Sequence, residues 1–291
     1  MEILKAAILG IIQGFTEFFP VSSSGHLVIV PFLFGWKYIP VYFTVMLHLA
    51  TVFSLVAVLY REIWRIIRAF FTGIFSRKAR KENRYFKVSL FIIIASVPAA
   101  AAGFLAGDLI EGFFSKPLYT AIFLIVTAAL LFFGEFTGRK IEAKRNIADV
   151  AGQTENTEIY SGFSYWKAII IGVSQAIAIL PGISRSGSTI STGRFLGLKR
   201  EDSVRFSMLL SIPVILGAFI FEAYKSAGEI KMLDTGAIAG VAAGFIFAFL
   251  SGYIAIRFLV RFSRTRNLNY FAIYCIVIAI IVFILSAIKK I

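Results

Sequence analysis

The chain has 291 residues, of which 58% are hydrophobic and only 16% charged, and its mean hydropathy is +0.83. This composition excludes a water-soluble globular domain and is typical of a polytopic membrane protein. The net charge of +14 does not indicate nucleic-acid binding, because the Lys and Arg residues lie in short segments between apolar runs rather than on one solvated face.

The first apolar region, residues 3–34, is interrupted by the polar stretch QGFTEFFPVSSSGHL, from Gln13 to Leu27. Each half is shorter than the roughly 20 residues that a helix needs to cross the hydrocarbon core. Lipid cannot hydrogen-bond an interrupted backbone, so such a break persists only where protein or a water-filled cavity surrounds it. We therefore expect a re-entrant hairpin here.

Three apolar runs follow, near 41–60, 86–106 and 117–136, each long enough to span a membrane. A polar segment at 138–165, containing GQTENTE at 152–158, is expected to be a linker that is too short to form a domain.

The second half repeats this order. Residues 166–197 are interrupted by QAIAILPGISRSGST, and three further spans are expected near 204–224, 236–256 and 268–287. Both interruptions carry Gly-x-x-Gln, a later Pro, and Ser-x-Ser-Gly, and SVPAAAAGF at 96–104 is echoed by SIPVILGAF at 211–219. Because the number of spans between the copies is odd, the second half must lie upside down relative to the first.

The predicted fold is therefore all-α and polytopic, with six transmembrane helices, two re-entrant hairpins and an inverted-topology repeat in a single membrane domain, residues 1–291. Repeat one covers 1–137 and repeat two 166–291. Of the 30 Lys and Arg residues, 21 lie in the segments 61–87, 137–167, 198–205 and 257–266. The positive-inside bias places these segments in the cytoplasm and both termini outside.

Four ionisable residues are expected at membrane depth, where their cost points to a functional site: Glu17, His26, His48 and Arg185. Glu17 and Arg185 lie in the two equivalent interruptions, so the inverted fold would bring a carboxylate and a guanidinium to one cavity. The alternative is a buried structural ion pair.

The second interruption indicates an oxyanion site around Arg185. Hydroxyls and backbone amides there would donate to phosphate oxygens beside the guanidinium fork, and the expected contacts are Ser184, Ser186, Gly187 and Thr189. Packing of small residues between helices is the alternative explanation. It accounts for the glycines but not for the arginine.

The first interruption places three hydroxyls between Glu17 and His26. Ser22, Ser24 and Gly25 are expected to contact phosphate, and Ser23 needs a neighbouring base, Glu17 or His26, to become a nucleophile. No cluster has the spacing of a protein metal cage, but a divalent cation can be held by one carboxylate together with phosphate oxygens and water. Glu17 would be that metal ligand, with Gln13 supporting it one helical turn away. His48 is expected to be a further supporting residue of the site.

These motifs resemble the undecaprenyl-diphosphate phosphatase family, the bacitracin-resistance type of membrane enzyme. QGFTEFFPVSSSGHL fits the family's (Glu/Gln)-x-x-x-Glu motif with its Ser-Ser-x-Gly-His run, and LPGISRSGST fits its Pro-Gly-x-Ser-Arg-Ser motif. The resemblance covers essentially the whole chain.

The resemblance implies hydrolysis of undecaprenyl diphosphate to recycle the lipid carrier of peptidoglycan synthesis, with bacitracin resistance as a consequence. It also implies a divalent cation, Mg²⁺ or alternatively Ca²⁺, a homodimer in the cell membrane, and a cavity facing the outer, periplasmic side. Glu17 would be the essential acid, Ser23 the nucleophile or a polarising hydroxyl, His26 an assisting base or a hydrogen-bond partner, and Arg185 the phosphate clamp. Gln13 stands where many members have a glutamate, which removes one carboxylate.

Two questions stay open at the level of sequence. Inverted repeats with broken helices also build transporters, so a flippase of the polyprenyl phosphate carrier is the alternative function. The residues do not decide between a phosphoseryl intermediate and direct attack by water. A purely structural membrane protein would not explain Glu17 and Arg185 at depth.

Overall fold

The computed structural model describes residues 2–36, 39–114, 116–150, 160–228 and 233–289, and every regular element in these ranges is a helix. The all-α prediction is therefore confirmed. The helices are α1 (Ile3–Phe18), α2 (Ser23–Phe34), α3 (Val41–Phe75), α4 (Arg77–Glu82), α5 (Arg84–Phe114), α6 (Pro117–Val150), α7 (Tyr165–Ile177), α8 (Arg185–Phe195), α9 (Arg200–Lys225), α11 (Thr235–Thr265) and α12 (Asn269–Lys289).

Six helices in the described ranges are long and apolar enough to cross a membrane: α3, α5, α6, α9, α11 and α12. Each overlaps one of the six predicted spans. The chain is therefore a multi-pass membrane protein. The other helices at the two predicted interruptions, α1, α2, α7 and α8, have 16, 12, 13 and 11 residues.

Several helices continue well past the predicted ends of the spans. α3 runs to Phe75 and α11 to Thr265, so the segments expected to be cationic loops are largely helical. α6 likewise runs to Val150, so the expected linker from 138 is helical in its first part, whereas 151–159, with the whole of GQTENTE, lies outside the described residues. Lys and Arg are good helix formers whose long side chains extend towards water, so a cationic segment does not have to end a helix.

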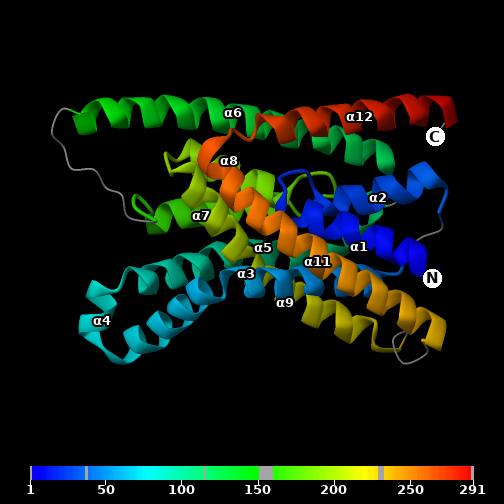
Figure 1. Cartoon of the computed structure of the whole chain (residues 1–291), viewed down its shortest axis with the longest axis horizontal. Helices are drawn as coiled ribbons and strands as arrows, with labels where there is room; N and C mark the ends of the chain where they lie inside the picture. The colour runs from blue at the N-terminus through cyan, green and yellow to red at the C-terminus, as the bar shows by residue number, and fades with distance from the viewer. Residues whose placement is uncertain (1, 37–38, 115, 151–159, 229–232, 290–291) are drawn as a thin grey trace.

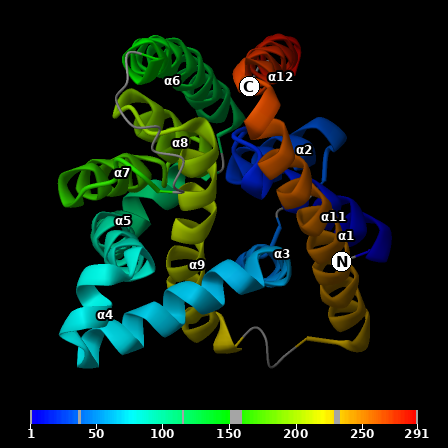
Figure 2. The same cartoon turned by 60° about the vertical axis from the view of Figure 1, so that its left-hand side comes forward.

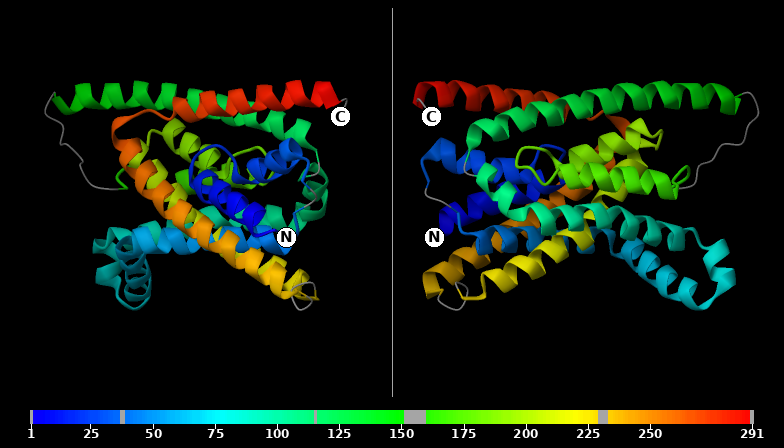
Figure 3. Two further views of the ribbon diagram at one scale, coloured as in Figure 1. Left: turned by 45° about the vertical axis from the view of Figure 1, so that its right-hand side comes forward. Right: turned by 180° about the vertical axis from the view of Figure 1, so that it is seen from behind.

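The short helices lie between two layers of long helices in the view of Figure 1. α6 and α12 pack side by side along one edge, α3 and α5 lie towards the other, and α1, α2, α7 and α8 lie between them (Figures 1 and 3). α1 packs mainly along α11, and α7 along α5. Figure 2 shows these pairs from the side, with α9 and α3 crossing near them.

Two glycines permit these close helix contacts. A Cβ at Gly10 of α1 would collide with the backbone of Gly244 in α11, and a Cβ at Gly172 of α7 would collide with the backbone of Ala95 in α5. Gly10 and Gly172 are the first residues of the shared Gly-x-x-Gln pattern. The glycine of the pattern thus allows α1 to approach α11, and α7 to approach α5, closely.

A network of charges joins helices at the predicted cytoplasmic ends. Arg205 of α9 binds the Glu62 carboxylate of α3 at 2.8 Å, and Tyr160 donates a hydrogen bond to the same carboxylate. Burial, together with the Glu62 charge, raises the pKa of Tyr160 well above its ordinary value, so the hydroxyl remains a neutral donor.

Candidate active site

The second short helix of each half begins with the same N-cap. Ser22 precedes α2 and its Oγ accepts a hydrogen bond from the Gly25 amide at 3.2 Å, while Ser184 precedes α8 and its Oγ accepts one from the Gly187 amide at 3.0 Å. The Ser-x-Ser-Gly pattern is therefore a capping signal. It makes Ser23 and Arg185 the first residues of α2 and α8.

The two turns before these helices are bonded to one another. The Gly182 amide donates to Ser22 Oγ at 3.1 Å, and Ser186 Oγ donates to the Phe19 carbonyl at 3.1 Å. Thr127 of α6 braces the second turn, because its hydroxyl donates to the Gly182 carbonyl and accepts from the Ser184 amide, each at 2.9 Å. The starts of α2 and α8 are thus held in a fixed relation.

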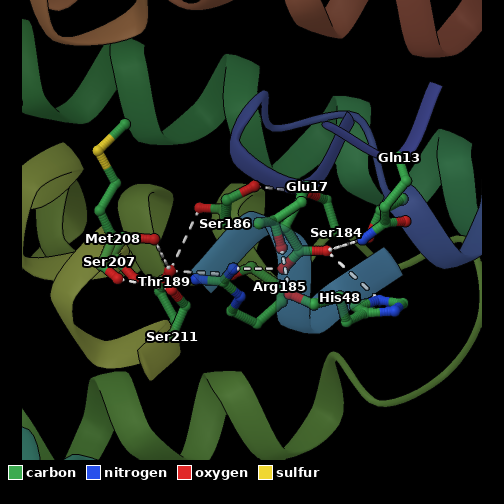
Figure 4. Close-up of polar contacts among 12 residues, drawn as sticks. Gln13, Glu17, His48, Ser184, Arg185, Ser186, Thr189, Ser207, Met208 and Ser211 are labelled. Atoms are coloured by element: carbon green, nitrogen blue, oxygen red, sulfur yellow. Dashed lines mark hydrogen bonds and ion pairs between the residues drawn. The ribbon is translucent and has the colours of Figure 1, made fainter. Parts of the chain in front are cut away.

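The carboxylate of Glu17 lies where the two helix starts meet, and the side chain is only 6% exposed. Oε1 accepts from Arg185 Nη2 at 2.7 Å, and Oε2 accepts from Ser23 Oγ at 2.7 Å and from Gln13 Nε2 at 2.9 Å. His48 Nε2 lies 3.4 Å from Oε2 (Figure 4). The acidic and basic residues of the two halves do share one site.

Arg185 is fixed from a second side by α9. Its Nη1 donates to the Ser207 carbonyl at 2.9 Å, and the hydroxyls of Thr189 and Ser207 are 2.7 Å apart (Figure 4). Thr189 also donates to the Arg185 carbonyl at 2.9 Å. Thr189 therefore ties α8 to α9.

Beside this cluster is a cavity of about 880 Å³. Its polar lining comprises Glu17, Ser22, Ser23, Ser24, Thr44, His48, Gln175, Arg185 and Glu222. The rest of the lining is apolar and comes from α2, α3, α5, α9 and nearby segments, including Phe32, Val45, Ala99, Ile179 and Phe219. A mainly apolar cavity with a few convergent polar groups suits an amphiphilic ligand.

The phosphate contacts predicted from the two interruptions divide into two groups. Ser22 and Ser24 line the cavity together with Ser23. Ser184, Ser186, Gly187 and Thr189 do not line it, and neither does Gly25. The hydroxyls of Ser184, Ser186 and Thr189 are used in the cap and in contacts between helices, which is the role of small polar residues at packed interfaces.

His26 is not brought to Ser23 as expected for an assisting base. Its Nδ1 is 2.7 Å from the Ser22 carbonyl, its Nε2 is 2.9 Å from the Tyr274 hydroxyl, and the ring does not line the cavity. Both ring nitrogens are engaged, because α2 turns the imidazole towards α12. His26 therefore holds the start of α2 in place, and His48 is the histidine that contacts Glu17.

The sequence did not single out Tyr274, Thr127 or Ser207 as site residues. Tyr274 is one aromatic residue within an apolar span, and the two hydroxyl residues act from helices distant in sequence. Gln175 was seen only as a member of the repeated pattern, although it lines the cavity. Its repetition was the one available signal.

The residues present fit a divalent cation only together with a ligand. Among the described residues, no group of three His, Cys, Asp or Glu is arranged to hold a metal ion. Both oxygens of Glu17 already accept hydrogen bonds. One carboxylate can still hold Mg²⁺ when phosphate oxygens and water supply the other ligands.

Comparison with known proteins identifies the family of this chain. A family model described as bacitracin resistance protein BacA matches residues 6–281, which include every residue of the cluster around Glu17. The chain belongs to the BacA family.

Members of the BacA family from diverse organisms align with almost the whole chain. The protein named undecaprenyl-diphosphatase from Alkaliphilus metalliredigens is 39% identical over 295 residues, covering 98% of this chain and 99% of the relative. The one from Pelotomaculum thermopropionicum is 37% identical over 291 residues, covering 100% and 99%. Undecaprenyl-diphosphatase 1 of Shouchella clausii is 36% identical over 284 residues, covering 98% and 96%.

Proposed function

We propose that the protein hydrolyses undecaprenyl diphosphate to undecaprenyl phosphate and inorganic phosphate. The observation that carries the proposal is the pair of hydrogen bonds by which Ser23 and Arg185 engage Glu17 at the polar part of an otherwise apolar cavity. The names of full-length relatives support it. In the cell membrane this reaction would recycle the lipid carrier for peptidoglycan synthesis, with effects on cell shape and bacitracin resistance.

The cavity matches the two parts of such a substrate. The diphosphate would lie against Glu17, Ser23 and Arg185, and the first prenyl units would lie along the apolar lining. Arg185 can bind phosphate while keeping its two contacts, because a guanidinium has five N–H groups. The N-termini of α2 and α8, which both point at the cluster, would add favourable dipoles for an anion.

Ser23 is the nucleophile in this proposal. Its hydroxyl donates to Glu17 Oε2 at 2.7 Å, which is the arrangement of a nucleophile and its general base. Oγ would attack the terminal phosphorus, the bond from that phosphorus to the bridging oxygen would break, and the Ser23 proton would pass to Glu17. Water would then attack the phosphorus of the phosphoserine, the bond from that phosphorus to Oγ would break, and Glu17 would return its proton to Ser23. Both protons of the water would leave with the released dihydrogen phosphate.

Direct attack by water, with Ser23 only polarising the phosphate, is the competing route. Substrate labelled in its terminal phosphate separates the two routes. We expect label on wild-type protein after a rapid acid quench and none on Ser23→Ala. A Ser23→Ala variant with normal turnover would exclude the phosphoserine.

We propose that a divalent cation, Mg²⁺ or alternatively Ca²⁺, enters with the diphosphate and that Glu17 is its protein ligand. The cation would neutralise phosphate charge when bound. The proposal is supported by the single carboxylate in the cluster, which leaves the remaining ligands to phosphate oxygens and water.

We further propose that α1–α2 and α7–α8 are re-entrant hairpins of an inverted repeat, with both termini outside and the cavity open to the outer face. Support comes from the shared caps, from the odd number of spans between the copies, and from the two termini lying together at the end of the molecule opposite α4 (Figure 1). Cysteine accessibility at the termini and at α4 in intact cells tests the orientation. A homodimer is proposed on the family resemblance alone, and cross-linking in native membranes tests it.

The activity itself is tested by phosphate release from undecaprenyl diphosphate by purified protein in detergent, with and without Mg²⁺. Wild type should be active, and Glu17→Ala and Arg185→Ala should be inactive. Activity that survives both substitutions would refute the assigned site. A carrier would need the phosphate clamp but no Ser23–Glu17 pair, so the flippase alternative is less favoured.

A further inference from the structure

Gln175 is a buried polar side chain without a hydrogen-bond partner in the part of the chain that the structure describes. It lies in the last turn of α7, is 1% exposed and lines the cavity beside the Glu17 cluster. Neither Nε2 nor Oε1 has a hydrogen-bond partner among the described residues. An amide buried without partners is destabilising by roughly 1–3 kcal/mol, and a partner that arrives from the cavity would remove this cost.

The equivalent residue of the first half shows what is missing. Gln13 also stands three residues after a helix-packing glycine, and its Nε2 donates to Glu17, four residues later. The residue four positions after Gln175 is Ile179, which is apolar. In the first half, Glu17 accepts the hydrogen bond of the Gln13 amide. In the second half, Gln175 has no acceptor among the described residues, and its side chain lines the cavity.

We propose that Gln175 binds the diphosphate of the substrate, with Nε2 donating to a phosphate oxygen. This inference rests on the proposed function and adds a residue to its binding site. Phosphate oxygens are acceptors, so they satisfy the donor of the amide. The α7–α8 half then contacts the diphosphate through Gln175 as well as through Arg185, while the α1–α2 half supplies Glu17 and Ser23.

Steady-state kinetics of Gln175→Leu and Gln175→Glu on undecaprenyl diphosphate test the proposal. Leu has nearly the volume of Gln and removes the amide, so KM should rise about 10- to 100-fold, the value of one hydrogen bond to a charged group, with a smaller change in kcat. Glu should raise KM further, because its carboxylate would face the diphosphate. The inhibition constant of inorganic pyrophosphate should rise in the same order.

Ser191→Ala is the matched control. Ser191 Oγ is also buried and also has no partner among the described residues, but it does not line the cavity, so KM should be unchanged. Thermal unfolding separates binding from packing. Because the Gln175 amide makes no hydrogen bond to any residue that the structure describes, Gln175→Leu should unfold at the wild-type temperature or above it.

Three outcomes would overturn the proposal: a wild-type KM in Gln175→Leu, a lowered unfolding temperature in that variant, or a reduced Mg²⁺ requirement in Gln175→Glu. The last would assign the amide oxygen to the cation instead. If the wild type releases no phosphate, the proposed function fails by itself. The thermal shift caused by pyrophosphate in wild type and in Gln175→Leu then decides the inference, and equal shifts overturn it.

Discussion

Ser23 and Arg185 occupy the same position in two helices that are far apart in sequence. Each is the first residue of its helix after a serine cap, and each donates a 2.7 Å hydrogen bond to the carboxylate of Glu17. The repeated pattern thus carries a hydroxyl at this position in α2 and a guanidinium at the same position in α8. Both helix N-termini favour negative charge at this point, first that of Glu17 and then that of phosphate.

A double-mutant cycle on Glu17 and Arg185 measures how strongly the two charges depend on each other. Glu17→Gln and Arg185→Met should each lower kcat by about 10²–10³-fold or more, because each removes a group from the reacting centre. Each single change also leaves a buried charge without its partner, which costs about 3–5 kcal/mol of unfolding free energy. The double variant should lose less stability than the sum of the single losses, as chemical denaturation in detergent would reveal.

Strict additivity of the two stability losses would contradict a direct Glu17–Arg185 pair. Retained activity in either single variant would contradict their place in the chemistry.

The Arg194–Glu142 ion pair provides a structural counterpart. Arg194 of α8 is 1% exposed and binds Glu142 of α6 through both terminal nitrogens, away from the cavity lining. Arg194→Met should lower the unfolding free energy by about 1–3 kcal/mol, because the remaining Glu142 is 33% exposed and water can solvate it, while the folded protein keeps its kcat and KM. Kinetics normalised to the folded fraction would show it, and a selective loss of kcat would place Arg194 in the active site instead.

The convergence of Glu17 and Arg185 was predicted from the repeated sequence pattern and the odd number of spans, and the 2.7 Å contact between the two side chains agrees with that prediction. In the proposed inverted repeat, the two interruptions would face each other from opposite sides of the membrane. The six spans were equally predictable, because about 20 apolar residues in a row have few other stable arrangements. Helix ends were not, since the cationic residues of α3, α6 and α11 continue the helix.

The role of His26 could not be predicted because it depends on Tyr274, which is 248 residues away in the chain. No local pattern says which way α2 turns its imidazole. The same holds for Gln175, whose missing partner depends on the cavity and on Ile179. Tertiary contacts, rather than motifs, decided which polar residues reach the cavity.

His48 should act in proton transfer at Glu17. Its Nδ1 is bonded within its own helix, 2.8 Å from the Thr44 carbonyl, and its Nε2 faces Glu17 at 3.4 Å on the cavity wall. His48→Ala should therefore lower kcat by about 10²–10⁴-fold, the usual contribution of a general acid or base, and leave the unfolding temperature nearly unchanged. Added imidazole should restore part of the rate, because the cavity gives it access to Glu17. A variant that unfolds early and is not rescued would indicate a packing role.

Gly182 should be the residue of the second turn that is least tolerant of substitution. Its φ of +105° is a conformation that residues with a Cβ rarely adopt, and a Cβ there would lie 2.8 Å from Phe123 Cβ and collide with the Thr120 carbonyl. Gly182→Ala should cost about 1–3 kcal/mol of unfolding free energy. It should also lower kcat by about 10²-fold, since the shifted turn displaces Arg185.

Gly217→Ala is the control for Gly182→Ala. Gly217 lies within α9, and a Cβ there meets no atom within 4 Å, so alanine should stabilise the protein by roughly 0.5–1 kcal/mol through its higher helix propensity. Thermal unfolding and phosphate release should be measured for both variants in the same detergent. The two results then compare substitution at a strained glycine with substitution at a glycine inside a helix. Equal behaviour of the two variants would contradict the strained turn as the device that sets the position of Arg185.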